Sequence, residues 1–241
     1  MRCGPRGFVI IGIILGTCLQ LDRDTVTSGQ DAFVADREGM VADQIAGRDV
    51  RDVRVLAAMR EVPRHRFVHD ALQRQAYDDR PLPIGHDQTI SQPYIVALMT
   101  ELARPGRGDR VLEVGTGSGY QAAVLSRLVS HVYTIELVAD LARSAEQRLK
   151  ALGYANVTTR AGDGYAGWPE MAPFDIIMVT AAPDHVPAPL LEQLRPGGRL
   201  VVPVGPAAEV QELQLLEKDN GGRTRTKHIA PVRFVPLLRA R

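Results

Sequence analysis

Short apolar runs separated by turn residues recur along the chain and predict a series of buried strands. Four runs, rich in β-branched residues, lie at 110–114, 131–135, 157–160 and 175–180. A helix stop at 194–198 precedes a fifth strand, and 212–216 and 229–235 are expected to close the sheet. This order predicts an α/β fold with a doubly wound, mainly parallel seven-stranded sheet and an antiparallel edge.

The region ahead of these strands has a helical pattern instead. Apolar positions recur at helical spacing between 50 and 72, with Pro63 separating a first helix from a second one around 67–72. A bare sheet domain would not need this region. We therefore expect an N-terminal helical cap over about 35–93, followed by a core over about 94–241.

A stiff segment at 80–94 connects the cap to the core. Its prolines and glycine predict a loop that ends at a helix beginning near Ser91. Ser91 is expected to be the N-cap residue of that helix, with Pro93 in its first turn. Capping accounts for Ser91, but it does not account for the apolar, stiff character of the loop before it.

The composition fits one such domain with appendages and shows no bias toward a charged partner. The chain has 241 residues, of which 45% are hydrophobic, and its 29 basic residues nearly balance 28 acidic ones. Nothing here predicts a nucleic-acid stripe or a membrane-surface patch. The basic cluster at 223–227 follows Asn-Gly-Gly, which predicts a hairpin turn into an edge strand, with phosphate binding as the alternative.

The cysteines and histidines argue against a metal centre. Cys3 and Cys18 both lie near the N-terminus, so the remaining chain has neither a disulfide nor a thiolate metal site. His65 and His69 lie four residues apart in a helical stretch, but no third ligand follows at a motif spacing. We expect solvated helix histidines and no metal.

The N-terminal segment resembles a secretory signal. Arg2 and Arg6 precede an apolar run at 8–19, which is shorter than the ~20 residues that span a bilayer comfortably. Residues 15–18 weakly resemble a lipoprotein cleavage box, and the alternative is an extension from an upstream start codon. We therefore divide the chain into a signal-like or extension segment with linker, 1–30, and a folded domain, 31–241.

The strongest chemical signal is a glycine loop directly after the strand at 110–114. Gly115, Gly117 and Gly119 alternate with Thr116 and a serine. A dinucleotide-binding loop has the pattern G-x-G-x-x-G, and its third glycine is absent here. The pattern resembles the cofactor loop of S-adenosylmethionine-dependent methyltransferases, where glycines let the backbone approach the methionine part of the ligand.

Acidic residues lie at or just after the ends of three successive predicted strands. Glu113 precedes the glycine loop, where we expect it to orient the loop amides and also to face the ligand. Glu136 ends the second strand, a position suited to ribose hydroxyls, and Asp163 beside Gly164 suits an adenine amino group, with a loop cap as its alternative. Small residues after Thr180 leave room for a ligand. In open α/β sheets such strand ends form the binding crevice.

Four segments together resemble one enzyme family. They are 83–94, 112–120, 162–169 and 194–205, and they occur in order within about 35–236. They are similar to the signature segments of the protein-L-isoaspartate O-methyltransferases, which implies a methyltransferase sheet. Two departures are Asp87, where the family usually has a glycine, and the N-terminal extension.

The resemblance implies a protein repair reaction. The methyl group of S-adenosylmethionine is transferred to the α-carboxylate of an L-isoaspartyl residue, and the ester cyclises to a succinimide that reopens to aspartate. The nucleophilic carboxylate is already ionised at pH 7, so catalysis requires positioning and exclusion of water more than acid–base chemistry. The alternative is an S-adenosylmethionine-dependent methyltransferase of another carboxylate or of a small molecule.

The resemblance also assigns roles to the segment at 80–94 and to partners. Ser91 is expected to hold the substrate carboxylate, while Thr89 and Ile90 belong to the loop that covers the cofactor. The implied substrates are damaged proteins and peptides with L-isoaspartyl residues, without nucleic acid, and the enzyme is expected to be a monomer without metal. The family's location is cytoplasmic, and the alternative is export or membrane tethering through residues 1–20.

Overall fold

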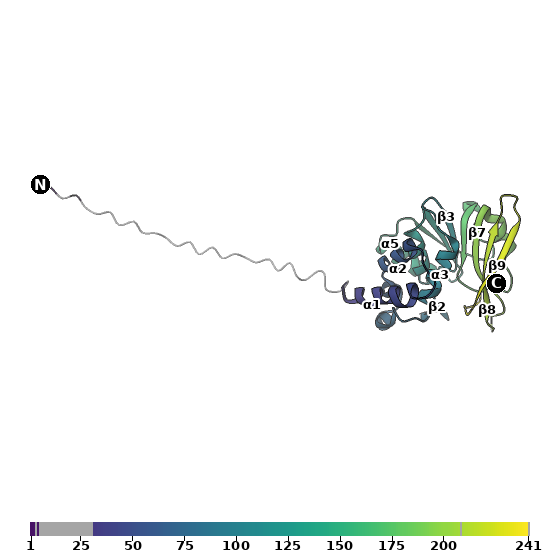
Figure 1. The fold of residues 1–241 in the computed structure, drawn as a ribbon, viewed down its shortest axis with the longest axis horizontal. Helices are drawn as coiled ribbons and strands as arrows, with labels where there is room; N and C mark the ends of the chain where they lie inside the picture. Colours follow the sequence, from purple (N-terminus) through teal and green to yellow (C-terminus); the bar gives the residue numbers. More distant parts are fainter. Residues whose placement is uncertain (3, 5–30, 208, 241) are drawn as a thin grey trace. The chain divides into compact units, whose positions relative to one another are not determined.

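The computed structural model describes residues 1–2, 4, 31–207 and 209–240. The chain divides into two units, Met1–Ala32 and Phe33–Arg241, and the second is described here by itself (Figure 1). The predicted signal-like segment lies almost wholly outside the described residues. Within the described part, no helix has both the length and the apolar character needed to cross a membrane.

A seven-stranded sheet forms the centre of this unit, as the sequence predicts. Its spatial order is β5-β4-β3-β6-β7-β8-β9, with parallel pairing from β5 to β7 and antiparallel pairing from β7 to β9. The strands are β3 (Arg110–Val114), β4 (His131–Glu136), β5 (Val157–Ala161), β6 (Phe174–Val179), β7 (Leu194–Val204), β8 (Gln211–Lys218) and β9 (Thr224–Val232). The predicted hairpin turn joins β8 to the edge strand β9.

Alternating side chains of the parallel strands divide the core into two layers. Val111 and Met178 pack with residues of α3 (Pro93–Ala103), α4 (Tyr120–Ser126) and α5 (Ala139–Ala151). Leu112 and Val179 face the opposite side, where they pack with Leu190 of α6 (Ala188–Gln193). Successive strand residues point to opposite faces, so helices cover both sides and the doubly wound prediction is confirmed.

The N-terminal region is helical, as predicted, but it is more broken than the pattern suggested. Its elements are η1 (Asp31–Phe33), α1 (Val34–Gly39), η2 (Met40–Ala46), α2 (Val53–Glu61), η3 (Arg64–Phe67) and η4 (Asp70–Gln75). Val62 is extended, with φ −79° and ψ 115°, because the ring of Pro63 disfavours a helical residue before it. The second predicted helix is therefore two short 3₁₀ turns.

This break changes the environment of the two histidines. His65 is buried, stacks on Phe33 at 4.4 Å and lies 2.8 Å from the Tyr77 hydroxyl through Nδ1. Burial lowers the pKa of His65 to about 4, so the ring is neutral. The expectation of a solvated histidine is wrong for His65 and holds for the exposed His69. Within the described residues, no three side chains of metal-ligating type gather.

The predicted loop at 80–94 is a hairpin rather than an irregular segment. Strands β1 (Leu82–Gly85) and β2 (Gln88–Ile90) pair antiparallel across a turn at His86 and Asp87. Both turn residues have positive φ, 53° and 55°, which asparagine, aspartate and glycine tolerate best. Asp87 therefore occupies a left-handed position for which the family's usual glycine is suited.

Helix α3 begins later than the sequence suggests. It starts at Pro93, and its N-cap residue is Gln92, which makes no side-chain capping hydrogen bond. Ser91 lies one residue before the cap, so the N-cap prediction is wrong. The chain remains extended after β2, and Pro93 in the first turn lacks the N–H group that a capping side chain would satisfy.

Candidate active site

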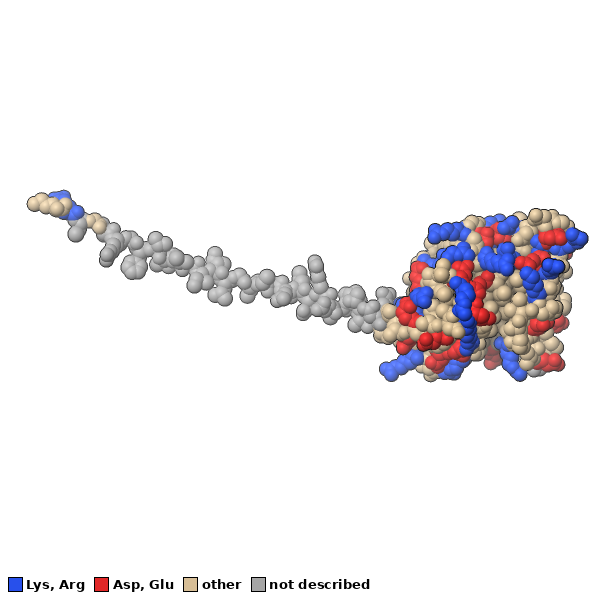
Figure 2. Space-filling view, in the orientation of Figure 1, with Lys and Arg blue, Asp and Glu red and all other residues tan. Residues whose placement is uncertain are grey.

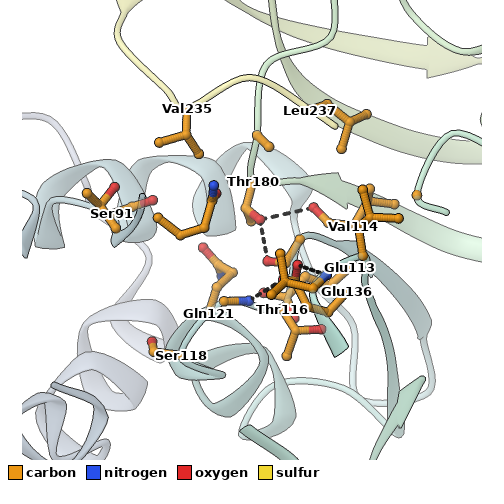
Figure 3. A pocket seen from close by; sticks show the side chains of 18 of the residues that line it. Ser91, Glu113, Val114, Thr116, Ser118, Gln121, Glu136, Thr180, Val235 and Leu237 are labelled. Carbon is orange, nitrogen blue, oxygen red and sulfur yellow. Dashed lines mark hydrogen bonds between the residues drawn. The ribbon is translucent and has the colours of Figure 1, made fainter. Parts of the chain in front are cut away.

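A pocket opens at the carboxyl ends of β3, β4 and β6 (Figure 3). Its walls come from the loop after β3, the end of β4, the segment after β2 and the C-terminal segment 235–238. Ten of the twelve predicted site residues line it: Thr89, Ile90, Ser91, Glu113, Gly115, Thr116, Gly117, Glu136, Gly164 and Thr180. The remaining two are Gly119 and Asp163. The strand ends thus bring together residues that are far apart in sequence.

The glycine loop is held closely against its neighbours. Gly115 has φ +98°, and a Cβ atom there would lie 2.5 Å from Thr180 Oγ1. Gly119 is the N-cap residue of α4 at φ +87°, where a Cβ atom would lie 3.1 Å from Leu149 Cδ1. Gly115 therefore lets β3 turn toward the pocket, whereas Gly119 lets α4 pack on α5.

Thr180 fastens this loop from the neighbouring strand. Its hydroxyl lies 3.0 Å from the carbonyl oxygen of Val114 and 2.6 Å from that of Gly115. The backbone N–H of Thr180 also donates to the Val114 carbonyl at 2.9 Å. These contacts fix the start of the glycine loop, which is a positioning role for Thr180 at the pocket edge.

Glu136 fastens the same loop from β4. Its Oε2 atom accepts from the backbone N–H of Gly117 at 2.8 Å, and its Oε1 atom accepts from that of Val138 at 3.0 Å. A carboxylate has about four acceptor positions, so Glu136 keeps acceptor capacity toward the pocket that it lines.

Glu113 is the most deeply placed acid of the site, with no exposed side-chain surface. Its Oε2 atom accepts from the Thr134 hydroxyl at 2.6 Å, and Thr134 in turn lies 2.6 Å from the Thr116 hydroxyl. No group of the described residues hydrogen-bonds to its Oε1 atom. Burial raises the pKa of Glu113 to about 8, and the charge of Glu136 adds to the increase, whereas the Thr134 hydroxyl and the backbone N–H of Ala122 oppose it.

Asp163 does not line the pocket and has other partners. Its Oδ1 atom accepts from the backbone N–H of Tyr165 at 2.9 Å, and its Oδ2 atom accepts from that of Ala240 at 3.2 Å. The neighbouring Gly164 does line the pocket, and a Cβ atom on it would collide with Val114 Cγ1. Asp163 thus ties this turn to the C-terminal segment.

The C-terminal segment is a wall of the pocket that the sequence did not reveal. Ala182 donates to the carbonyl of Val235 and accepts from the N–H of Leu237, both at 2.8 Å. These bonds hold 235–238 beside the pocket, more than a hundred residues after the glycine loop. No local pattern marks the segment as a site, because only the return of the chain beside β6 places it there.

Two polar residues near the glycine loop were also missed. Ser118 lies within the loop, Gln121 is the second residue of α4, and both line the pocket. The Gln121 amide donates to the Thr100 hydroxyl at 2.9 Å, which orients it from α3. The position of Gln121 on the first turn after the glycine loop is a signal that could have found it.

A second groove adjoins the pocket on the far side of Ser91. Ser91, Thr89 and Thr180 line both, and the groove continues along 231–235 and Ile95. The Ser91 hydroxyl makes no hydrogen bond to another described residue, so it is free to bind a ligand. The arrangement therefore offers two adjacent binding spaces, with the uncommitted hydroxyls of Ser91 and Thr89 at their junction.

Known proteins share this architecture. Residues 35–241 match the family described as Protein-L-isoaspartate(D-aspartate) O-methyltransferase (PCMT). The chain belongs to this family. It is 59% identical to a protein-L-isoaspartate O-methyltransferase of Opitutus terrae over 85% of this chain and 87% of that protein. It is 60% identical to protein-L-isoaspartate O-methyltransferase 2 of Syntrophobacter fumaroxidans over 79% of this chain and 77% of that protein.

Solved structures of the family agree with the fold. A protein-L-isoaspartate O-methyltransferase superposes with a TM-score of 0.76 at 32% identity, covering 83% of this chain and 65% of that chain. A family member from Plasmodium falciparum, solved in complex with S-adenosyl-L-homocysteine, gives a TM-score of 0.73 at 25% identity, covering 84% and 98%. The predicted family, fold, cosubstrate and isoaspartyl methylation activity are confirmed.

Proposed function

We propose that the pocket at the ends of β3, β4 and β6 binds S-adenosylmethionine and that the adjoining groove receives the isoaspartyl segment of a damaged protein. The observation that carries this proposal is the position of Ser91. It lines both spaces, it caps no helix and its hydroxyl is uncommitted. A hydroxyl there is suited to donate a hydrogen bond to the substrate carboxylate while that carboxylate faces the cofactor pocket.

Different residues around the pocket then contact different parts of the cofactor. Gly115 and Gly117 let the backbone approach the methionine part, and Glu136 offers its remaining acceptor capacity to the ribose hydroxyls. Asp163 and Gly164 stand at the adenine end, where Asp163 acts through the turn that it fastens.

The other predicted residues support these contacts. Thr116 joins the hydroxyl chain that ends at Glu113, and Gly119 allows α4 to begin close to α5. Thr89 and Ile90 bring the hairpin strand β2 over the pocket, and Ile90 is buried there. Thr180 stands between pocket and groove, so its fixed hydroxyl defines their common edge.

The chemistry needs positioning more than proton transfer. The cosubstrate supplies a methyl group on a sulfonium, and the substrate carboxylate supplies its own negative charge at pH 7. A carbon–oxygen bond forms as the carbon–sulfur bond breaks, and no proton moves. Ser91 orients the carboxylate, and apolar Ile90, Val235 and Leu237 exclude water from it. This division fits a site without a nucleophile–base pair.

The decisive experiment compares two peptides that differ only in one linkage. One peptide contains L-isoaspartate and the other contains L-aspartate at the same position, and both are incubated with labelled S-adenosylmethionine. A misplacement of about 1 Å costs roughly 100-fold in a reaction driven by positioning, so only the isoaspartyl peptide should be methylated at a substantial rate. Similar rates for both peptides would show a general carboxyl methyltransferase instead.

We further propose that the substrates are damaged proteins and that the enzyme acts as a cytoplasmic monomer without nucleic acid. Basic and acidic side chains alternate over the face shown in Figure 2, which supports the expectation of no nucleic-acid partner. Export through residues 1–20 remains the alternative location. Mass spectrometry of the N-terminus from separated cell fractions, together with the sedimentation velocity of the purified protein, tests both points.

A further inference from the structure

Two acids line the cofactor pocket, and their carboxyl groups have very different surroundings. Both oxygens of Glu136 accept backbone N–H groups. Glu113 is fully buried, accepts one hydroxyl through Oε2 and has no partner for Oε1 among the described residues. Burying a carboxylate with an unpaired oxygen costs far more free energy than burying the neutral carboxyl group. The surroundings of Glu113 therefore favour its neutral form in the empty pocket.

No side chain that faces Glu113 contributes a compensating positive charge, although the Thr134 hydroxyl and the backbone N–H of Ala122 in α4 both favour its ionised form. From β4 come the Thr134 hydroxyl and the negative Glu136, and from β6 the apolar Met178, which is directly opposite in the sheet. The remaining neighbours in the pocket wall are uncharged: Thr116 and Ser118 from the glycine loop, and Tyr120 and Gln121 from α4. Burial raises the pKa of Tyr120, so its hydroxyl stays neutral. No lysine, arginine or histidine lines the pocket within the described residues.

A pocket with two acids and no cationic side chain is matched to a cationic ligand. S-adenosylmethionine carries an ammonium, a sulfonium and a carboxylate group and so has a net positive charge. S-adenosylhomocysteine lacks the sulfonium and has no net charge, but it keeps the ammonium group. We propose that Glu113 is protonated in the free enzyme and loses its proton to solvent when a cationic cofactor occupies the pocket. This inference rests on the proposed cofactor site, and it makes cofactor binding a proton-releasing step.

The pH dependence follows from linkage. An opposite charge nearby stabilises the carboxylate, so bound cofactor lowers the pKa of Glu113 from its raised value of about 8 in the free enzyme. At a pH between the two values, binding releases up to one proton, and affinity rises as pH rises. The expected increase is up to about tenfold per pH unit and ends once Glu113 is ionised in the free enzyme.

Calorimetry of the full-length enzyme tests this directly. S-adenosylmethionine and S-adenosylhomocysteine are titrated without peptide. Titrations near neutral pH in buffers that differ in ionisation enthalpy give the number of protons released, and titrations over a pH series give the pH dependence of the affinity. For S-adenosylmethionine we expect net proton release and an affinity that rises with pH. For S-adenosylhomocysteine we expect a smaller release, because it lacks the sulfonium charge. Glu113→Gln keeps the size of the side chain but cannot ionise, so proton release should vanish and affinity should become nearly independent of pH.

Glu136→Gln is the matched control in the same pocket. Affinity should fall, but proton release should persist with its midpoint at lower pH, because the negative neighbour of Glu113 is removed. Thr134→Val serves if Glu113→Gln does not fold. It removes the hydroxyl that favours ionised Glu113, so the midpoint should move to higher pH.

The outcomes separate this inference from the proposed function. A wild-type enzyme that binds neither ligand would overturn the cofactor site itself. Binding without proton release, at an affinity constant with pH, would overturn only the role of Glu113. Proton release that persists in Glu113→Gln, or an unchanged midpoint in Thr134→Val, would assign the proton to another group and would also overturn it.

Discussion

Gly115 offers a sharp test of how the cofactor loop is built. It has φ +98°, and an added Cβ atom would meet Thr180 Oγ1 at 2.5 Å. Alanine at this position therefore brings backbone strain and also displaces the hydroxyl that fastens the loop at 2.6 Å and 3.0 Å. Gly115→Ala should lower both the free energy of unfolding and the affinity for the cofactor.

The size of the effect can be estimated from its two parts. The left-handed backbone costs an L-residue roughly 1–2 kcal/mol, and the displaced hydroxyl loses a hydrogen bond of about 0.5–1.5 kcal/mol. The sum of about 1.5–3.5 kcal/mol corresponds to a decrease in Tm of about 3–14 °C for a domain of this size. Gly153 is the matched control, because it has φ +80° and no atom within 4 Å of an added Cβ.

Thermal unfolding and calorimetry with S-adenosylhomocysteine measure both quantities. Gly153→Ala should lose only the strain part and keep wild-type affinity, whereas Gly115→Ala should lose affinity as well. Adding Thr180→Ala should relieve the contact, since the Thr180 Cβ atom lies 3.8 Å from the added one. Equal losses for the two glycine variants, or strictly additive effects of Gly115→Ala and Thr180→Ala, would refute the close-packing explanation.

Three further predictions concern the acids and Ser91. Ser91→Ala should leave the Tm almost unchanged, because Ser91 caps no helix, whereas turnover per folded molecule should fall steeply. A variant with the specific activity of the wild type would show that Ser91 does not bind the substrate carboxylate. Glu136→Ala should weaken S-adenosylhomocysteine binding by roughly ten- to a hundredfold, because charged hydrogen bonds are lost. Asp163→Ala should weaken binding less, because Asp163 acts only through the turn that it fastens. Calorimetry that finds the larger loss for Asp163→Ala would contradict this order. The raised pKa of Glu113 means that the folded state retains a proton that the unfolded state loses, so this contribution to stability is lost as pH rises from 4.5 to about 8. Denaturant unfolding of the ligand-free enzyme should show this decline, by up to about 1.4 kcal/mol per pH unit, and Glu113→Gln should lack it; identical slopes would contradict the assignment.

The elements that the sequence predicted well are those specified by local pattern. The strand ending at Glu136 was predicted with its limits, and the glycine loop was placed correctly between β3 and α4. Apolar runs report burial on both faces of a parallel strand, and glycines report positive φ, so both signals are local. The rule that ligands occupy the carboxyl ends of such strands then gathered most site residues in one pocket.

The predictions that failed depended on where a turn or helix stops. Ser91 was assigned to a helix cap, but the hairpin before it carries the extended chain to Gln92. His65 was assigned to solvent, but the break at Pro63 turns its ring toward Phe33. In both cases the helix boundary lies within one or two residues of the predicted one. Packing, and not the local pattern, decided what the side chain contacts.

The sequence by itself determined the family, the sheet and the chemical type of each site residue. The tertiary structure decided which partners those residues have. Glu113 and Glu136 are equivalent in a sequence pattern, yet only the fold pairs both oxygens of Glu136 and leaves one oxygen of Glu113 unpaired. It also brings residues 235–238 to the pocket, because hydrogen bonds between segments distant in sequence form only once the sheet has assembled.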